Sequence, residues 1–532
     1  MRKLFNILLV GTLVFAASSC KKYLDINENP NSPTTNTPAL VLPQALTATG
    51  NLITTYNNAG MWEAGYQANA GGVGGWGTVW SYNYTTATNN GMWTGTYDNA
   101  NDYQYVINNT SPSDITVNFN AAARIMKSFL FLRLVDQYGS LPYVDALKGP
   151  LAITPKYDKD SEIYKMIYDD LTGVITALDA NVAGATTIAT AGTNQVDVIF
   201  GGDMAKWRAF ANTLRLKILV KSKGTVNDSF VTGKTLTGAF ITDDVVVQPG
   251  YNATAGKANT MFVNFAYTAT GAAGVLGGQQ IPTPWILSFY NGTKLTDGKR
   301  GAAIYKNFAA NTVAKNQLGV DVEPIDRSPG AGSAWFTGTG TGSSATGIGV
   351  LKGINAAAPI MLAAEAYFLQ AEANLNGVGG VTTAYTTSFN AGVVASFTYL
   401  YKNAAGTVTG TPAVDAATYQ TANAASSAPY LANISVAANN AQRLEAIITQ
   451  KYIAMNFIHG EEAFAEFRRT TYPTIVNGSS SNTATFASTK SQSTRADKLP
   501  VRQQYPASEY QLNSSNVPTV NQFTDKIFWD LN

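Results

Sequence analysis

The stretch AQRLEAIITQKYIAMNFIHGEEAFAEFRRTTYP, from Ala441 to Pro473, carries the clearest structural signal in the chain. Its apolar side chains recur three or four residues apart, at Leu444, Ile447, Ile448, Tyr452, Met455, Ile458, Ala463, Phe464 and Phe467. This spacing keeps one helical face apolar for about seven turns and predicts a single long amphipathic helix. Arg468 and Arg469 suit a helix C-terminus, and Pro473 prevents its continuation. Other helices must cover the apolar face.

The opposite face of this predicted helix is polar. It carries Glu445, Gln450, Lys451, Glu461, Glu462 and Glu466. We expect the neighbouring carboxylates Glu461 and Glu462 to lie on a solvated face, as do the pairs Asp169/Asp170 and Asp243/Asp244. Gly460 falls inside the pattern, and its low helix propensity is expected to weaken the helix only locally.

The same stretch resembles the C-terminal helix of the SusD/RagB-like outer-membrane lipoproteins. Other segments resemble the same family in the same order: CKKYLDINENPNSPT from Cys20, DQYGSLPYVDAL from Asp136, KWRAFANTLRLKI from Lys206, AAEAYFLQAEA from Ala363, and the C-terminal RQQYPASEYQLN and IFWD. The resemblance covers nearly the whole chain after its leader. It implies a mainly α fold, in which a tetratricopeptide-like frame of helix pairs carries long loops and short strands on one side.

The first residues have the features of a secretory leader. Arg2 and Lys3 precede an apolar run that ends in ASSC at Cys20. The run is shorter than the roughly 20 apolar residues that a membrane-spanning helix needs. This pattern predicts cleavage before Cys20 and lipidation of its thiol, and the alternative is an ordinary signal peptide with an incidental cysteine. Cys20 is the only cysteine, so an internal disulfide is excluded.

We therefore divide the chain into a lipoprotein signal peptide (1–19), a lipidated N-terminal tether (20–38) and a single SusD-like domain (39–532). Helical patterns lie at Leu40–Tyr56, Met92–Asn108, Asn120–Tyr138, Ser161–Asp179, Met204–Lys223, Pro284–Tyr290 and Pro359–Asn374. They place a helical frame at 39–223 and 355–475, with loop-rich, ligand-facing segments at 70–91, 224–349 and 377–427. Within these loops, Val245–Gln248 and Phe262–Tyr267 are predicted strands.

Composition excludes several classes of function. Hydrophobic residues make up 45% of the chain and charged residues 13%, which suits a folded protein with a sizeable core. Without Arg2 and Lys3, 34 basic residues balance 34 acidic ones, so no basic field would attract nucleic acid.

Side chains that carry catalysis are scarce. His459 is the only histidine, so with one cysteine the chain lacks the ligands of a zinc site. A serine triad would have to use His459, and no G-x-S-x-G motif accompanies it. A packed or surface role for His459 is the simpler interpretation. We therefore expect no enzyme activity, no cofactor and no metal site.

Aromatic residues, at 11% of the chain, are a stronger signal. Trp76, Trp80, Tyr82 and Tyr84 crowd a Gly-rich loop without helical period, and Trp335 lies in another such loop. Sugars stack their apolar C–H faces on such rings, so these five residues are the predicted ligand site, with Trp335 as the opposing wall. The alternative is that the rings pin the loops to the frame.

The resemblance implies a cell-surface lipoprotein that is held in the outer membrane by its lipid anchor. Such a protein binds oligosaccharide and delivers it to a SusC-like TonB-dependent transporter, on which it docks as a lid. Two alternatives stay open, a peptide-binding RagB-like lipoprotein with the same kind of partner and a structural subunit of the transporter.

Overall fold

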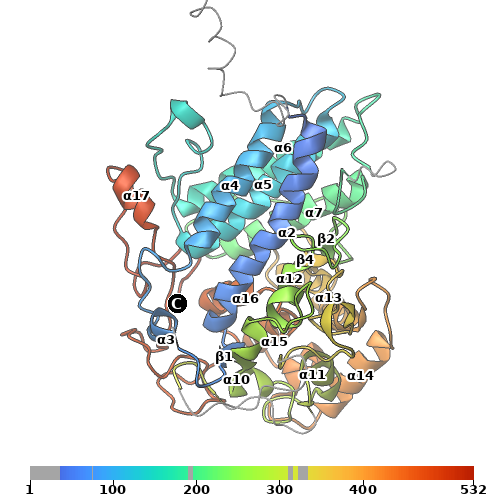
Figure 1. Cartoon of the computed structure of the whole chain (residues 1–532), viewed down its shortest axis with the longest axis vertical. Coiled ribbons are helices and arrows are strands. Elements are labelled where there is room, and N and C mark those ends of the chain that lie inside the picture. The colour runs from blue at the N-terminus through green and yellow to red at the C-terminus, as the bar shows by residue number, and fades with distance from the viewer. Residues whose placement is uncertain (1–35, 75, 190–195, 309–315, 321–332) are drawn as a thin grey trace, which may run out of the picture.

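The computed structural model describes residues 36–74, 76–189, 196–308, 316–320 and 333–532. Most of its regular structure is helical (Figure 1). The longer helices are α2 (Pro38–Glu63), α4 (Asn90–Asn108), α5 (Val117–Tyr138), α6 (Asp160–Asp179), α7 (Met204–Ser222), α12 (Ala363–Leu375), α13 (Tyr385–Tyr401), α14 (Pro412–Ala422), α15 (Asn440–Ala454) and α16 (Gly460–Thr470). The shorter ones are α3 (Gly77–Ser81), α8 (Asp228–Val231), α9 (Thr260–Phe265), α10 (Pro284–Leu287), α11 (Gly298–Ile304) and α17 (Ala507–Leu512).

Consecutive helices pack on one another, as expected for a frame of helix pairs. In the upper half of Figure 1, α4 lies against α2 and α5, α5 against α6, and α6 against α7. Helix α7 also contacts α12, which pairs with α13 and α15 and so joins the two halves of the chain. The predicted mainly α fold is confirmed, and each helical pattern named above from the sequence overlaps a helix. The start of the pattern Pro359–Asn374 is the exception, because it forms a strand, Ala358–Met361, and the helix begins only at Ala363.

Two short antiparallel ribbons accompany the helices. Strand β1 (Gln67–Asn69) pairs with β3 (Gln280–Pro282), and β2 (Val245–Val247) pairs with β4 (Ala358–Met361). The strand predicted at Val245–Gln248 is thus confirmed.

The strand predicted at Phe262–Tyr267 is wrong, because this segment forms helix α9. The Asn259 side-chain oxygen accepts a hydrogen bond from the Phe262 backbone N–H and caps that helix (3.0 Å). Phe262 and Phe265 are both buried, so a local cap and apolar packing make this segment helical.

The predicted single long helix over 441–473 is also wrong. It is two helices, α15 and α16, separated by a turn in which Phe457 has a φ of +66°. Asn57 of α2 holds this turn, because its Nδ2 donates to the Phe457 carbonyl (2.9 Å) and its Oδ1 accepts from the Gly460 N–H (2.8 Å). Gly460 therefore begins a helix instead of interrupting one.

Segment 377–427, predicted as a ligand-facing loop, contains α13 and α14. Phe389, Val393 and Phe397 of α13 are fully buried, and α13 packs along α12. Tertiary packing stabilises this helix despite its threonine, serine and aromatic residues, which have low helix propensity.

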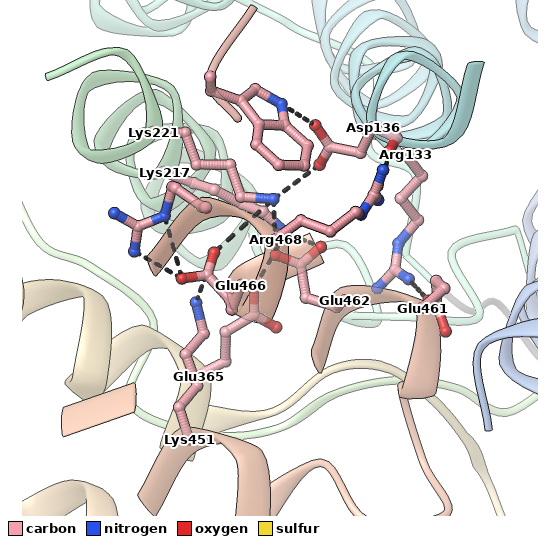
Figure 2. Close-up of polar contacts among 12 residues, drawn as sticks. Arg133, Asp136, Lys217, Lys221, Glu365, Lys451, Glu461, Glu462, Glu466 and Arg468 are labelled. Atoms are coloured by element: carbon pink, nitrogen blue, oxygen red, sulfur yellow. Dashed lines mark hydrogen bonds and ion pairs between the residues drawn. The ribbon is translucent and has the colours of Figure 1, made fainter. Parts of the chain in front are cut away.

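The polar face of α16 is buried, contrary to the expectation of a solvated face (Figure 2). Glu461, Glu462 and Glu466 are each at most 2% exposed. Their cationic partners come from α5, α7, α15 and α16: Arg133 for Glu461, Lys217 and Lys221 for Glu462, and Lys221, Lys451 and Arg469 for Glu466. We call this set the ion cluster. Since buried charges require partners, the cluster specifies how α16 sits against the surrounding helices.

Lys221 lies at the centre of the ion cluster. Its Nζ is 2.7 Å from Asp136 Oδ2 and 3.0 Å from Glu462 Oε1. Burial alone would lower the pKa of Lys221, but the charges of Asp136, Glu462 and Glu466 outweigh it and raise the pKa above its usual value. Trp529 is fully buried and donates from Nε1 to Asp136 (2.9 Å), so the C-terminal segment is anchored on the same cluster.

His459 is packed, as the simpler interpretation held, and it should make stability depend on pH. It is fully buried with Nε2 3.2 Å from the Pro359 carbonyl, and burial, aided by Arg133, lowers its pKa to about 3. In the unfolded chain this ring becomes protonated near pH 6.5, whereas in the folded chain it stays neutral down to about pH 3. Its contribution to the free energy of unfolding is therefore complete above pH 6.5 and is lost as the pH falls toward 3. At pH 5 we expect the loss to reach about 2 kcal/mol.

Urea unfolding of the wild type and of His459→Gln at pH 7.5 and pH 5.0 measures this contribution. Burial raises the pKa of Glu461 to about 7, so protonation of Glu461 stabilises the fold over the same pH interval in which His459 destabilises it. Glu461 is present in both proteins, so the difference between their pH-dependent changes in stability reports on His459. Equal changes in the two proteins would contradict the assignment to His459.

Candidate functional site

The Gly-rich segment after β1 folds into the short helix α3. Trp76 precedes the helix and Trp80 lies within it, and the Trp80 N–H donates to the Trp76 carbonyl (2.9 Å). The two rings are therefore one helical turn apart, which corrects the sequence-based view that they lack a helical period. Both rings are half-buried, while Gly77 and Thr78 between them are exposed. A Cβ on Gly74 or Gly77 would meet no atom within 4 Å, so this side of the segment is open.

Each of the two indoles has one defined neighbour. The Trp76 ring packs on Trp62 of α2, with centroids 4.6 Å apart at 55°. The Lys490 ammonium lies 4.1 Å from the centroid of the Trp80 ring, a cation–π distance. Both indole N–H groups are enclosed and have no hydrogen-bond acceptor among the described residues. The arrangement leaves two partly exposed aromatic surfaces beside a single positive charge.

Tyr82 and Tyr84 instead fasten this segment to the core. The Tyr82 hydroxyl accepts from the Ser488 N–H (3.2 Å), and the Tyr84 hydroxyl donates to Glu63 Oε1 (2.6 Å). Gln503 Nε2 donates to the same carboxylate oxygen (2.6 Å). Burial raises the pKa of both Glu63 and Tyr84. Since both tyrosine rings are less than 7% exposed, they match the alternative in which aromatic side chains pin the loop.

Trp335 is also a core residue and not an exposed wall. Its ring is 0% exposed and lies 4.2 Å from the centroid of Phe457 and 5.2 Å from that of Tyr305. The structure therefore does not present Trp335 on a common surface with Trp76 and Trp80. The physical reason is the turn between α15 and α16, where Phe457 offers an apolar surface that Trp335 covers.

Sequence reasoning missed Lys490 and Trp62. Lys490 lies in a C-terminal segment that returns to α3, where the Gln492 N–H donates to the Ser81 carbonyl (2.9 Å). No local pattern links Lys490 to Trp80, so only the fold reveals their contact. Trp62 ends the apolar pattern of α2, and its helical spacing could have identified it as a support for the loop.

A groove lies between the exposed side of α2 and the segment 249–275, away from α3. Its volume is about 930 Å³, and its lining is mixed. Small apolar residues alternate with polar ones, among them Asn51, Asn252 and Asn264, and Lys257 is its charged member. None of the five predicted site residues lines this groove. A groove of this chemistry suits an uncharged polar molecule, although Tyr251 is itself buried and offers little ring surface.

Three further expectations concern metal, membrane and lipid. Within the described ranges, no three or more His, Cys, Asp and Glu side chains gather as a metal site would require. No helix in that part of the chain has the length and apolar character to cross a membrane. The predicted lipidation site, Cys20, lies outside the described residues.

Two family models match the chain on either side of its middle. The model described as "Starch-binding associating with outer membrane" matches residues 30–248, and the model described as "Susd and RagB outer membrane lipoprotein" matches residues 348–527. No curated protein sequence matches the chain.

Solved structures share the fold over almost the full length. A chitin-binding SusD homologue from Flavobacterium johnsoniae is similar with a TM-score of 0.64 and 19% identity, covering 93% of this chain and 98% of the other. A SusD homologue from Bacteroides vulgatus gives 0.61 and 20%, covering 90% and 92%. One from Bacteroides fragilis gives 0.61 and 18%, covering 93% and 99%. At these identities the similarity establishes the fold.

Proposed function

The chain belongs to the SusD/RagB family of outer-membrane lipoproteins, and from this premise we propose that it binds oligosaccharide at the cell surface and hands it to a SusC-like TonB-dependent transporter. Its role in this proposal is capture, without catalysis. Residues 39–532 act as a single ligand-binding domain, carried on the lipidated tether 20–38. The shared fold with a chitin-binding SusD homologue supports a glycan as the ligand class.

The observation that carries this proposal is the pair of half-buried indoles on α3. Trp76 and Trp80 form the binding surface, held in place by Tyr82, Tyr84 and the contact with Trp62. A sugar ring stacks its C–H face on an indole, and its hydroxyls accept hydrogen bonds from a cation such as Lys490. At about 1 kcal/mol per aromatic contact, two rings and a few hydrogen bonds support micromolar to millimolar binding. Such an affinity suits a protein that must release its ligand.

Replacing either tryptophan should weaken glycan binding more than it changes stability. We expect Trp80→Ala to reduce affinity on the order of 5–10-fold, since a stacked ring contributes about 1 kcal/mol. Trp76→Ala should act similarly, with some loss of stability because its ring also packs on Trp62. Isothermal titration with the best glycan from an array, paired with thermal melting, separates the two effects.

Tyr385→Ala is the matched control. Tyr385 is another half-buried ring under a cation, since the Arg443 guanidinium lies 5.6 Å from its centroid, but it belongs to α13. The variant should bind glycan normally. If Trp76→Ala and Trp80→Ala also bind normally, or if both unfold, these rings only pin the loop and the site lies elsewhere.

Membrane attachment through Cys20 is the second part of the proposal. Each CH₂ group of the acyl chains adds about 0.8 kcal/mol of membrane affinity, so a triacylated Cys20 holds the protein firmly. Cys20→Ala should therefore appear in the soluble fraction after cell lysis, whereas the wild type pellets with membranes. A variant that stays in the membrane fraction at high salt would show that Cys20 is not the anchor. Protease treatment of whole cells then tests whether the protein faces outward.

A further inference from the structure

A loop between α5 and α6 exposes large apolar side chains at its tip. Leu151 is 90% exposed and Ile153 is 78% exposed, and Leu512 at the end of α17 is 75% exposed. We call these three side chains the apolar tip. Other strongly exposed apolar residues, such as Val275 and Val414, belong to separate segments.

The apolar tip is assembled by specific hydrogen bonds. The segment after α17 lies beside the loop, because Asn513 Nδ2 donates to the Pro155 carbonyl (2.8 Å) and Asn516 Nδ2 donates to the Thr154 carbonyl (3.1 Å). Two parts of the chain that are distant in sequence thus bring Leu512 next to the loop. An arrangement held by directed bonds fixes these side chains in an outward position.

Part of the backbone at the loop tip is hydrogen-bonded within the loop. Pro150 and Pro155 have no N–H group, the Leu151 N–H donates to the Lys148 carbonyl (3.3 Å), and the Ala152 N–H donates to the Gly149 carbonyl (3.1 Å). Unpaired backbone N–H groups are costly in a low-dielectric medium. Positions 150, 151, 152 and 155 therefore add no unpaired N–H group when the tip leaves water.

The charged side chains around the tip offset one another, so the tip carries no marked net charge. Lys148 pairs with Asp145 (3.0 Å), and Glu509 accepts from the Tyr157 hydroxyl (2.7 Å). Lys156 and Glu509 then contribute one charge of each sign. A surface that recognises the tip must do so through apolar contact, and anionic groups are not required.

In Figure 1 the loop between α5 and α6 and the start of α2 both lie in the upper part of the molecule. There the Tyr105 hydroxyl donates to the Asn36 carbonyl and fixes the segment that precedes α2. The predicted tether 20–38 joins the described chain at this end. The family is one of outer-membrane lipoproteins, so a lipid surface is the apolar phase nearest to the tip.

We propose that the apolar tip inserts into the lipid interface of the outer membrane and orients the protein upon it. Three side chains offer far less than the roughly 800 Å² per partner of a stable protein interface, but a bilayer needs no matching shape. Because the anchor already holds the chain at the surface, small contributions from Leu151, Ile153 and Leu512 suffice to favour one orientation. This inference rests on the proposed membrane attachment and is independent of glycan binding.

A single-cysteine label tests the insertion directly. The mature chain from Lys21, with an N-terminal histidine tag in place of Cys20, is held on phosphatidylcholine vesicles that contain nickel-chelating lipid. Since Cys20 is the only natural cysteine, Ile153→Cys then supplies the one thiol for a polarity-sensitive fluorophore. The matched control is Val414→Cys on α14, which is 62% exposed and lies at the opposite end in Figure 1.

Spin-labelled lipids should quench the label at 153 on the order of 3-fold more strongly than the label at 414. Quenching should be unchanged between low and high salt. Equal quenching at the two positions, or quenching at 153 that requires anionic lipid, would overturn the proposal. The proposal would also be overturned if the label at position 153 became shielded from solvent only after a partner protein was added.

A second readout guards against insertion driven by the fluorophore itself. With the label moved to Leu512→Cys, the double change Leu151→Ser/Ile153→Ser should abolish most of the quenching, and Val414→Ser should leave it intact. Persistent quenching in the double variant would contradict the role of the loop. The tag replaces the natural anchor and no glycan is present in this assay. A negative result would therefore argue against insertion of the tip without bearing on Cys20 acylation or glycan binding.

Discussion

Gly60→Ala is expected to lower the free energy of unfolding by about 4 kcal/mol or more, among the largest effects of any single methyl group. A Cβ on Gly60 would lie 1.8 Å from the Glu461 backbone nitrogen, and one on Gly460 would lie 2.5 Å from the Met61 nitrogen. Both neighbours are backbone atoms of crossing helices, so α2 and α16 would have to separate. Separation would also disturb the ion cluster that Glu461 joins.

Gly173→Ala on α6 is the control for this prediction. There the nearest atom to an added Cβ is Arg124 Nη2 at 3.3 Å, at the end of a flexible side chain. The higher helix propensity of alanine should make that variant neutral or up to about 1 kcal/mol more stable. Urea unfolding of both variants gives the comparison. A similar small effect for Gly60→Ala would mean that the close crossing of α2 and α16 is not essential.

Lys221→Met should cost on the order of 3–5 kcal/mol, because removing one partner leaves buried carboxylates uncompensated. Asp136 and Glu462 both rely on its ammonium group, and Glu466 lies 3.7 Å from it. Burial alone would raise the pKa of Glu466, but the charges of Arg469, Lys451 and Lys221 lower it to about 2. The double variant Lys221→Met/Asp136→Asn should recover part of the loss, since it removes one of the stranded charges.

Lys165→Met provides the matched surface control. Lys165 pairs with Glu162 at 2.8 Å, but both side chains are substantially exposed, so the loss should lie within about 1 kcal/mol. Chemical unfolding of the three variants at pH 7.5 measures the differences. If Lys221→Met proves as mild as Lys165→Met, the ion cluster does not control the position of α16.

The helical period predicted most of the frame, because the apolar faces of α4 to α7 repeat at the spacing of a helix. It failed at the turn between α15 and α16, where Gly60 and Asn57 of a distant helix determine the break. It also failed for the polar face of α16. A sequence pattern cannot distinguish a solvated polar face from one that meets complementary charges, and here Arg133, Lys217 and Lys221 supply them.

Loops were harder to interpret than helices. Helix α13 is rich in threonine, serine and aromatic residues, which have low helix propensity, and its packing on α12 and neighbouring helices stabilises it. Aromatic content drew attention to the segment before α4, but ring exposure depends on tertiary contacts. Tyr82 reaches the segment at Ser488 and Trp335 covers Phe457, while Trp76 and Trp80 keep partly exposed surfaces.

Glycan capture is tested by binding of the mature wild-type protein to parallel glycan and peptide arrays. Hits should be verified by titration, with the double variant Trp76→Ala/Trp80→Ala alongside. We expect micromolar to millimolar binding to at least one oligosaccharide and no comparable binding to peptides. The double variant should lose the glycan signal. Binding to peptides alone, or glycan binding that the folded double variant retains in full, would contradict the proposed glycan capture.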